Sequence, residues 1–169
     1  MKYTLIILSL ALAMTSCKKK STACESTPGT TVASATEEAM VTKYLDSMSI
    51  TNAIELEGSG MYYVIDTPGN SKKPGQCSNV TLKYNGHYRN GYSFDHTTGD
   101  ATATFTLNAL VEGWKRAIPL IGEGGYIRLF IPPSLGYGLA GYLNPNTGQY
   151  YILPNAVLIF EIKLVTVTN

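Results

Sequence analysis

Few side chains in this 169-residue chain are suited to covalent or acid–base catalysis. His87 and His96 are the only histidines, and neither lies in a recognisable nucleophile motif, which argues against hydrolysis by a catalytic triad. The glycines between residues 122 and 125 lack the spacing of a phosphate-binding or dinucleotide-binding loop. The three cysteines lack the paired spacing of a zinc site. The sequence therefore offers no support for a metal site, a cofactor or a nucleophile.

The single tryptophan is the residue that most needs an explanation. Trp114 lies in the segment LVEGWKRAI, residues 110–118, whose apolar side chains recur at helical spacing. The pattern predicts one short helix with the indole on its apolar side. Packing in the core would explain a lone tryptophan, and a binding pocket is the other interpretation. The elements around the helix decide between them.

Segments with alternating apolar and polar side chains predict the strands that surround this helix. Alternation with a period of two marks residues 61–65, 80–84, 103–107, 126–131 and 158–164. Because no long helix joins these segments, we expect an antiparallel sheet that is covered on one side. The predicted fold class is α+β, a curved antiparallel β-sheet wrapped around one short α-helix. In the third of these segments, Ala103, Phe105 and Leu107 should face inward.

A short amphipathic helix is predicted before the sheet, over residues 36–48. Thr36 can cap its N-terminus, Glu37 and Glu38 suit the first turn, and apolar side chains follow at helical spacing. About three turns of helix are marginal in isolation, so this helix must pack on another element.

The N-terminal residues predict export. Lys2 precedes an apolar run, residues 5–14, that is too short to span a bilayer, and small residues lead from it to Cys17. This arrangement resembles a bacterial lipoprotein signal, in which Cys17 is lipidated; cleavage of a plain secretory signal near Ser16 is the alternative. The residues that follow lack an apolar period and predict a flexible tether. The expected organisation is a signal peptide over 1–16, a tether over 17–35, the N-terminal helix and first strand over 36–75, and the main domain over 76–169.

The charge balance argues against nucleic acid as a partner, and the predicted export bears on the state of the cysteines. With 13 basic and 12 acidic side chains, the chain lacks the basic excess of a nucleic-acid-binding protein. Export implies an oxidising compartment, so a disulfide between Cys24 and Cys77 and two unpaired thiols both remain open.

Five segments, taken in order, resemble the FKBP-type peptidyl-prolyl cis-trans isomerases. They are KYNG (83–86), GYSFD (91–95), ATFTLNALVEGW (103–114), IPPSLGYG (131–138) and ILPNAVLIFEIKL (152–164). Each segment alone is a weak signal, but their order and spacing are specific, and together they cover about residues 76–165. The resemblance implies isomerisation of X–Pro bonds in an apolar pocket, without covalent, metal or cofactor chemistry.

The resemblance also implies the residues of the site. Trp114 would form the floor of a pocket for the proline ring, and Gly113 would let the backbone turn tightly into the helix. The Tyr137 hydroxyl and the Ile152 N–H would hold carbonyl oxygens of the substrate. The implied catalytic residues are Tyr84, Phe94, Asp95, Trp114, Tyr137 and Phe160, and the implied substrate-binding residues are Leu110, Val111, Ile152 and Ala103.

Two departures from the family pattern bear on the activity. Ala103 stands where the family usually has an aromatic wall, and residues 139–151 form a longer, tyrosine-bearing loop at the pocket mouth. A low-turnover binding module or chaperone on the same fold is therefore the alternative to an enzyme. The expected location is the cell envelope, with a lipid anchor in the outer membrane on its periplasmic or surface face. The expected partners are unfolded or partly folded exported proteins that contain proline, a tacrolimus-type macrolide, and the membrane through the lipid anchor.

Overall fold

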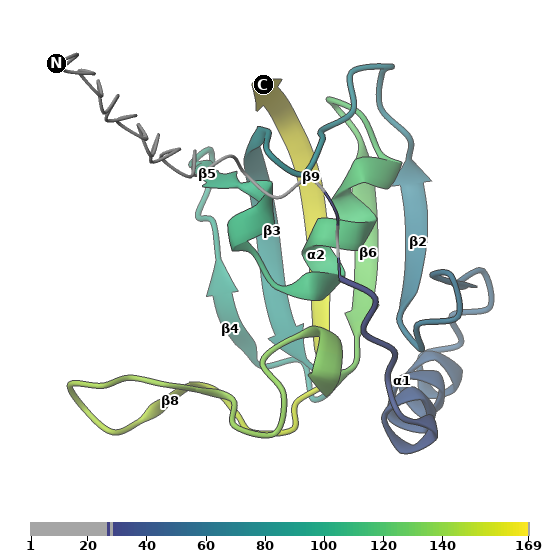
Figure 1. The fold of residues 1–169 in the computed structure, drawn as a ribbon, viewed down its shortest axis with the longest axis vertical. Coiled ribbons are helices and arrows are strands. Elements are labelled where there is room, and N and C mark those ends of the chain that lie inside the picture. The colour runs from purple at the N-terminus through teal and green to yellow at the C-terminus, as the bar shows by residue number, and fades with distance from the viewer. Residues whose placement is uncertain (1–26, 28, 169) are drawn as a thin grey trace, which may run out of the picture.

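The computed structural model describes residue 27 and residues 29–168, and it contains a seven-stranded antiparallel sheet that curves around the short helix α2, Glu112–Ala117 (Figure 1). The strand order is β1-β2-β6-β9-β3-β4, and β5 also pairs with β3. The predicted α+β class is confirmed. The strands of this sheet are β1 (Ile54–Glu55), β2 (Tyr62–Thr67), β3 (Asn79–Tyr88), β4 (Ser93–His96), β5 (Ala103–Thr106), β6 (Tyr126–Ile131) and β9 (Leu158–Thr168).

The remaining elements are short. Helix α1, Ala35–Ser47, precedes the sheet, and three 3-10 turns, η1 to η3, lie at Leu107–Ala109, Ile118–Leu120 and Pro133–Leu135. The predicted loop over residues 139–151 contains a small hairpin of its own, made of β7 (Tyr142–Leu143) and β8 (Tyr150–Ile152). No helix in the described ranges is both long and apolar enough to cross a bilayer.

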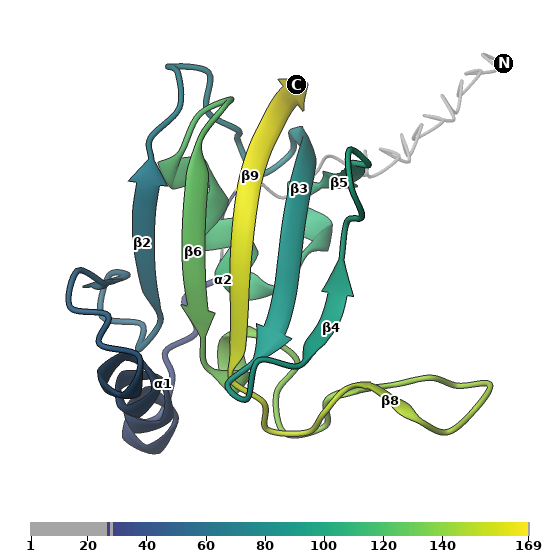
Figure 2. The ribbon, with the colours of Figure 1, turned by 180° about the vertical axis from the view of Figure 1, so that it is seen from behind.

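The core lies between α2 and one face of the sheet. The two longest strands, β3 and β9, pair along their length from Asn79–Thr168 to Tyr88–Leu158 at the centre of the sheet. The alternating side chains of β9, Leu158, Phe160, Ile162 and Leu164, are buried on the α2 side, as the period of two predicts. Figure 2 shows the sheet from its other face, with α2 behind it.

Helix α2 approaches the sheet so closely that one of its positions must be glycine. A Cβ atom on Gly113 would lie 2.8 Å from Cδ1 of Ile131 on β6, which is closer than such atoms can pack. Gly113 is not among the glycines with positive φ. The expected role of Gly113 in a tight turn is therefore wrong, and its function is to permit helix–sheet contact.

Helix α1 covers part of the opposite face of the sheet. Its buried side chains, Val41, Tyr44 and Leu45, pack against a second cluster that includes Phe130 and Ile159. Those two residues alternate with the residues of β6 and β9 that face α2, so the cluster lies on the other side. The prediction that the sheet is covered on one side only is wrong, because Phe130 interrupts the polar face of β6.

The N-terminus of α1 is capped two residues earlier than predicted. Ser34, and not Thr36, accepts a hydrogen bond from the Glu37 N–H, and the Glu37 carboxylate accepts one from the Ser34 N–H at 2.9 Å, which completes a capping box. The other oxygen of the Glu37 carboxylate accepts a hydrogen bond from the Ser134 N–H at 2.9 Å. Glu37 therefore joins α1 to η3, the turn that precedes Tyr137.

The described end of the predicted tether lies against the domain. The Arg116 guanidinium on α2 donates to the Thr31 carbonyl at 2.9 Å, and the Ala33 N–H donates to the Ser59 carbonyl at 2.9 Å. Cys77 is disulfide-bonded, while Cys24, the partner considered above, lies outside the described residues. The expected signal peptide and Cys17, the expected lipidation site, also lie outside them.

Replacement of Glu37 by Gln should lower the free energy of unfolding by roughly 1 kcal/mol at pH 7, the size of a helix-capping contribution. Burial acts to raise the pKa of Glu37, but the hydrogen bonds from Ser34 and Ser134 outweigh it and the pKa is lowered. A lowered folded-state pKa gives stability that is present above the unfolded-state pKa and is lost as pH falls through the folded-state pKa. Urea unfolding at several pH values should therefore show that the free energies of unfolding of the parent protein and of Glu37→Gln become equal at acidic pH.

The matched control is Asp46→Asn near the other end of α1, since the Asp46 carboxylate makes no side-chain hydrogen bond among the described residues. This change should alter the free energy of unfolding by less than about 0.5 kcal/mol. If Glu37→Gln and Asp46→Asn lowered the free energy of unfolding equally, the hydrogen bonds of Glu37 would not be the cause of the loss.

Candidate active site

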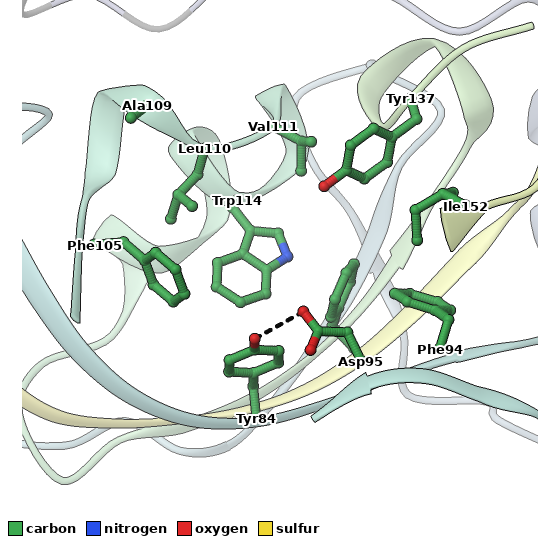
Figure 3. A pocket seen from close by; sticks show the side chains of 11 residues that line it. Tyr84, Phe94, Asp95, Phe105, Ala109, Leu110, Val111, Trp114, Tyr137 and Ile152 are labelled. Atoms are coloured by element: carbon green, nitrogen blue, oxygen red, sulfur yellow. Dashed lines mark hydrogen bonds between the residues drawn. The ribbon is translucent and has the colours of Figure 1, made fainter. Parts of the chain in front are cut away.

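A cavity of about 300 Å³ opens on the α2 side of the sheet (Figure 3). Its volume is at the lower end of the range for small-molecule sites. Nine of the ten predicted site residues line it: Tyr84, Phe94, Asp95, Leu110, Val111, Trp114, Tyr137, Ile152 and Phe160. Phe105 and Ala109 line it as well, and Ala103 does not.

Trp114 lies at the centre of a box of aromatic rings. Its side chain is only 4% exposed, and three rings stand edge-on to the indole at interplanar angles of 82–88°. The centroid distances from Trp114 are 4.9 Å to Phe160, 5.5 Å to Tyr84 and 6.4 Å to Phe105. Phe94 stands edge-on to Phe160 in turn, at 5.5 Å. Edge-to-face contact is a favoured geometry for aromatic rings, so the walls support one another.

A glycine on β3 leaves the space for two of these rings. A Cβ atom on Gly86 would lie 2.6 Å from the ring of Phe160 and 2.7 Å from that of Phe94. The glycine of the KYNG segment is therefore required by the packing of the pocket wall against the strand.

The prediction that Ala103 lies in the pocket wall is wrong. Strand β5 pairs with β3 so that Ala103 is opposite Leu82 and Phe105 is opposite Val80. Both residues are half-buried on the inward face, as the alternation predicts, but only Phe105 lines the cavity. Phe105 therefore supplies an aromatic side chain to the wall, two residues after Ala103, the position where the family usually has one. The alternating pattern identifies Ala103 and Phe105 as inward-facing residues, but it does not tell which of them reaches the cavity.

The polar groups of the cavity are one carboxylate and two hydroxyls. The Tyr84 hydroxyl donates to Oδ2 of Asp95 at 2.8 Å (Figure 3). Burial, together with this hydrogen bond and the charge of Asp95, raises the pKa of Tyr84. Burial and the charge of Asp95 also raise the pKa of Tyr137, whose hydroxyl points into the cavity (Figure 3). Both tyrosines therefore remain neutral O–H donors.

Two further donors at the cavity are not evident from residue types. Val111 precedes α2 as its N-cap and accepts from the Trp114 N–H, but its own N–H has no acceptor within residues 27 and 29–168. The indole N–H of Trp114 is buried and also lacks a partner in the described part of the chain. The unpaired Val111 N–H favours a ligand with a carbonyl oxygen, whereas the indole N–H is too inaccessible to donate to one. The family resemblance implies Val111 only as a substrate-binding residue and the Ile152 N–H as the backbone donor.

The cavity is thus an aromatic box whose inner surface offers neutral hydrogen-bond donors, which suits a small apolar ring flanked by carbonyl groups. Within the described ranges, no group of three or more side chains could hold a metal ion. The site is of the class of apolar ligand pockets lined by aromatic rings with a few polar groups.

Comparisons with known proteins agree with this class. The model of the FKBP-type peptidyl-prolyl cis-trans isomerase family matches residues 70–165, and the chain belongs to this family. It is 30% identical over 134 residues to the isomerase FkpA of Escherichia coli K12, covering 79% of this chain and 47% of the relative. It is 36% identical over 110 residues to the outer membrane protein MIP of Legionella longbeachae, covering 64% of this chain and 45% of the relative. The crystal structure of Escherichia coli FkpA matches with a TM-score of 0.66 at 29% identity, over 79% of this chain and 60% of that one. The chain spans about half the length of the curated relatives it matches.

Replacement of Phe105 by Leu should lower kcat/KM for a short X–Pro peptide about two- to tenfold, because an edge-to-face ring pair contributes roughly 0.5–1.5 kcal/mol beyond its buried area. Ala103→Val should change kcat/KM less than twofold. Both variants need circular dichroism spectra like that of the parent protein. A larger effect of Ala103→Val than of Phe105→Leu on kcat/KM would show that Ala103, and not Phe105, lies in the pocket wall.

Proposed function

We propose that this chain accelerates cis-trans rotation about X–Pro bonds in exported proteins. The observation that carries the proposal is the Trp114 floor with rings on its edges and with Tyr137 and the unpaired Val111 N–H beside it. X–Pro rotation is opposed by amide resonance and takes tens to hundreds of seconds without catalysis. A pocket that favours the twisted amide over the planar one would shorten that time.

The chemistry needs positioning and desolvation more than any reactive group. The proline ring would lie on Trp114 between Phe160 and Tyr84, away from water. The amide loses resonance, and with it charge separation, as it twists, so an apolar enclosure stabilises the twisted form more than the planar one. The Val111 N–H and the Tyr137 hydroxyl would hold carbonyl oxygens beside the rotating bond. An acceleration of three to five decades requires roughly 4–7 kcal/mol.

The position of Phe105 favours an enzyme over a low-turnover binding module. An open wall at Ala103 would favour the binding module, but the ring of Phe105 lines the cavity 6.4 Å from Trp114 and supplies an aromatic wall. An additional aromatic wall would shield the bound amide from water, which the proposed turnover requires. The same enclosure would accept the apolar ring of a tacrolimus-type macrolide.

The proposed location is the cell envelope, with a lipid anchor at Cys17. The apolar run that ends just before Cys17 supports a lipoprotein signal, and one relative carries the name of an outer membrane protein. The proposed partners are proline-containing exported proteins that are not yet folded. Intact mass of membrane-extracted protein should show acyl groups at Cys17, and Cys17→Ser should release the chain from membranes. A mature chain that begins at Cys17 without lipid would contradict the anchor.

A protease-coupled isomerisation assay with the residue before proline varied tests the activity. Tyr137→Phe should lower kcat/KM about two- to tenfold, the effect of one neutral hydrogen bond of roughly 0.5–1.5 kcal/mol. Tyr126→Phe is the matched control, because Tyr126 is a half-buried tyrosine on β6 that does not line the cavity. A parent protein that leaves the uncatalysed rate unchanged for every peptide would refute the proposal.

A further inference from the structure

We propose that a row of three tyrosines that leads out of the pocket forms a second binding surface for the unfolded client chain. The row consists of Tyr137, Tyr142 and Tyr151 and is called the tyrosine ladder below. It would take an aromatic or large apolar side chain that lies three or four residues from the proline. The inference rests on the proposed function, since it names the kind of segment that the same site prefers.

The tyrosine ladder begins inside the pocket wall and leads out of it. Tyr137 lines the cavity and stacks on Tyr142 at a centroid distance of 5.8 Å and an interplanar angle of 26°. Tyr142 stacks on Tyr151 at 5.5 Å and 25°. The three rings thus form a continuous surface from the proline site onto the β7–β8 hairpin, which projects beyond the sheet (Figures 1 and 2).

The base of the hairpin is fastened to the domain. The Leu153 N–H donates to the Tyr88 hydroxyl at 3.0 Å, and that hydroxyl donates to the Tyr151 carbonyl at 3.4 Å. The Asn155 N–H donates to the Gly138 carbonyl at 3.0 Å. Tyr88 itself packs on the pocket residue Phe94 at 4.9 Å, so the same rings support the pocket and the hairpin.

The far end of the hairpin is organised around Asn144. Its Oδ1 accepts from the Asn146 and Thr147 N–H groups, and its Nδ2 donates to the Tyr151 hydroxyl at 2.7 Å. The last of these bonds fixes the outermost ring of the tyrosine ladder. A rigid aromatic surface loses little conformational entropy when a ligand binds, which favours recognition.

The hairpin exposes apolar side chains and carries no charge. Tyr142 is 51% exposed, Tyr151 54% and Leu139 78%. The sequence from residue 129 to residue 160 contains no Asp, Glu, Lys or Arg. An apolar patch of this kind on the surface of a soluble domain marks an interaction site. Because it is continuous with the pocket through Tyr137, the occupant we infer is the chain that flanks a bound proline.

The length of the tyrosine ladder sets the position of the preferred side chain. The two centroid distances, 5.8 and 5.5 Å, place the Tyr151 ring at most about 11 Å from the Tyr137 ring. An extended chain advances about 3.3 Å per residue, so this reach corresponds to three or four residues. A tetrapeptide substrate is too short to use it.

The test compares a short X–Pro tetrapeptide with ten-residue peptides that share its X–Pro core. The longer peptides are otherwise Ser and Gly, with one Phe placed two to six residues from the proline on either side. Exchange rates from NMR give kcat and KM without a protease. A Phe three or four residues away, on one side, should raise kcat/KM about tenfold through KM, the expected effect of one or two ring contacts.

The double variant Tyr142→Ser/Tyr151→Ser should lose this gain, and Tyr142→Phe should keep it, because its ring and the hydrogen bond from Asn144 to the Tyr151 hydroxyl both remain. Tyr150→Ser is the matched control, since Tyr150 is 49% exposed on the same hairpin but stacks on no other ring among the described residues. The gain should survive in this control. The proposal is overturned if no Phe position gives a gain, if the gain persists in the double serine variant, or if Tyr150→Ser removes it equally.

Two further measurements distinguish failure of this proposal from failure of the proposed isomerase activity. Sedimentation that shows a dimer, or binding to phosphatidylcholine vesicles, with either property lost in the double serine variant, would assign the surface to a second copy or to lipid and overturn the proposal. If the parent protein does not accelerate the tetrapeptide, the proposed function fails. Calorimetric titration with the same peptides would then still decide whether the tyrosine ladder binds the Phe side chain.

Discussion

The contact of α2 with β6, where Gly113 meets Ile131, sets the depth at which Trp114 lies inside the curved sheet. A larger residue at position 113 would move the helix away from the strand, because a Cβ atom there has no space. The rings of Phe160, Tyr84 and Phe105 are fixed on strands, and they meet the indole edge-on only when the helix is close. The pocket therefore depends on a contact made by atoms that do not line it.

The elements before the sheet hold the site from two other directions. Helix α1 packs on the face opposite to α2, and its Glu37 carboxylate binds the turn that leads to Tyr137. The segment just before α1 is bound through its Thr31 carbonyl to Arg116 on α2. The helix that carries the pocket floor and the turn that carries a rim hydroxyl are thus both joined to the same short stretch of chain.

Periodicity predicted the long strands well, because β3, β6 and β9 alternate over many residues and their pairing follows from burial. It did not identify β1, β4, β7 or β8, which span two to four residues and are largely exposed. Nine pocket residues followed from the family resemblance, whereas Ala103 was placed in the pocket and Phe105 was not predicted there, because alternation shows which residues face inward but not which of them reaches the cavity. The free N–H of Val111 is a backbone group and leaves no trace in residue types. The capping residue differed by two positions, since Ser34 and Thr36 are both acceptable caps and only the contact with Glu37 distinguishes them.

The aromatic box is assembled from five separate segments: Tyr84 is on β3, Phe94 on β4, Phe105 on β5, Trp114 on α2 and Phe160 on β9. None of these segments contains enough of the box to bind a ring by itself. A molecule in the pocket therefore has affinity for the folded chain and essentially none for the unfolded one, so occupancy and folding are thermodynamically linked. At a concentration one hundred times its dissociation constant, such a ligand would add about 2.7 kcal/mol to the stability of the domain. Saturation of the site would then protect the central strands and α2 from opening together, as one cooperative unit.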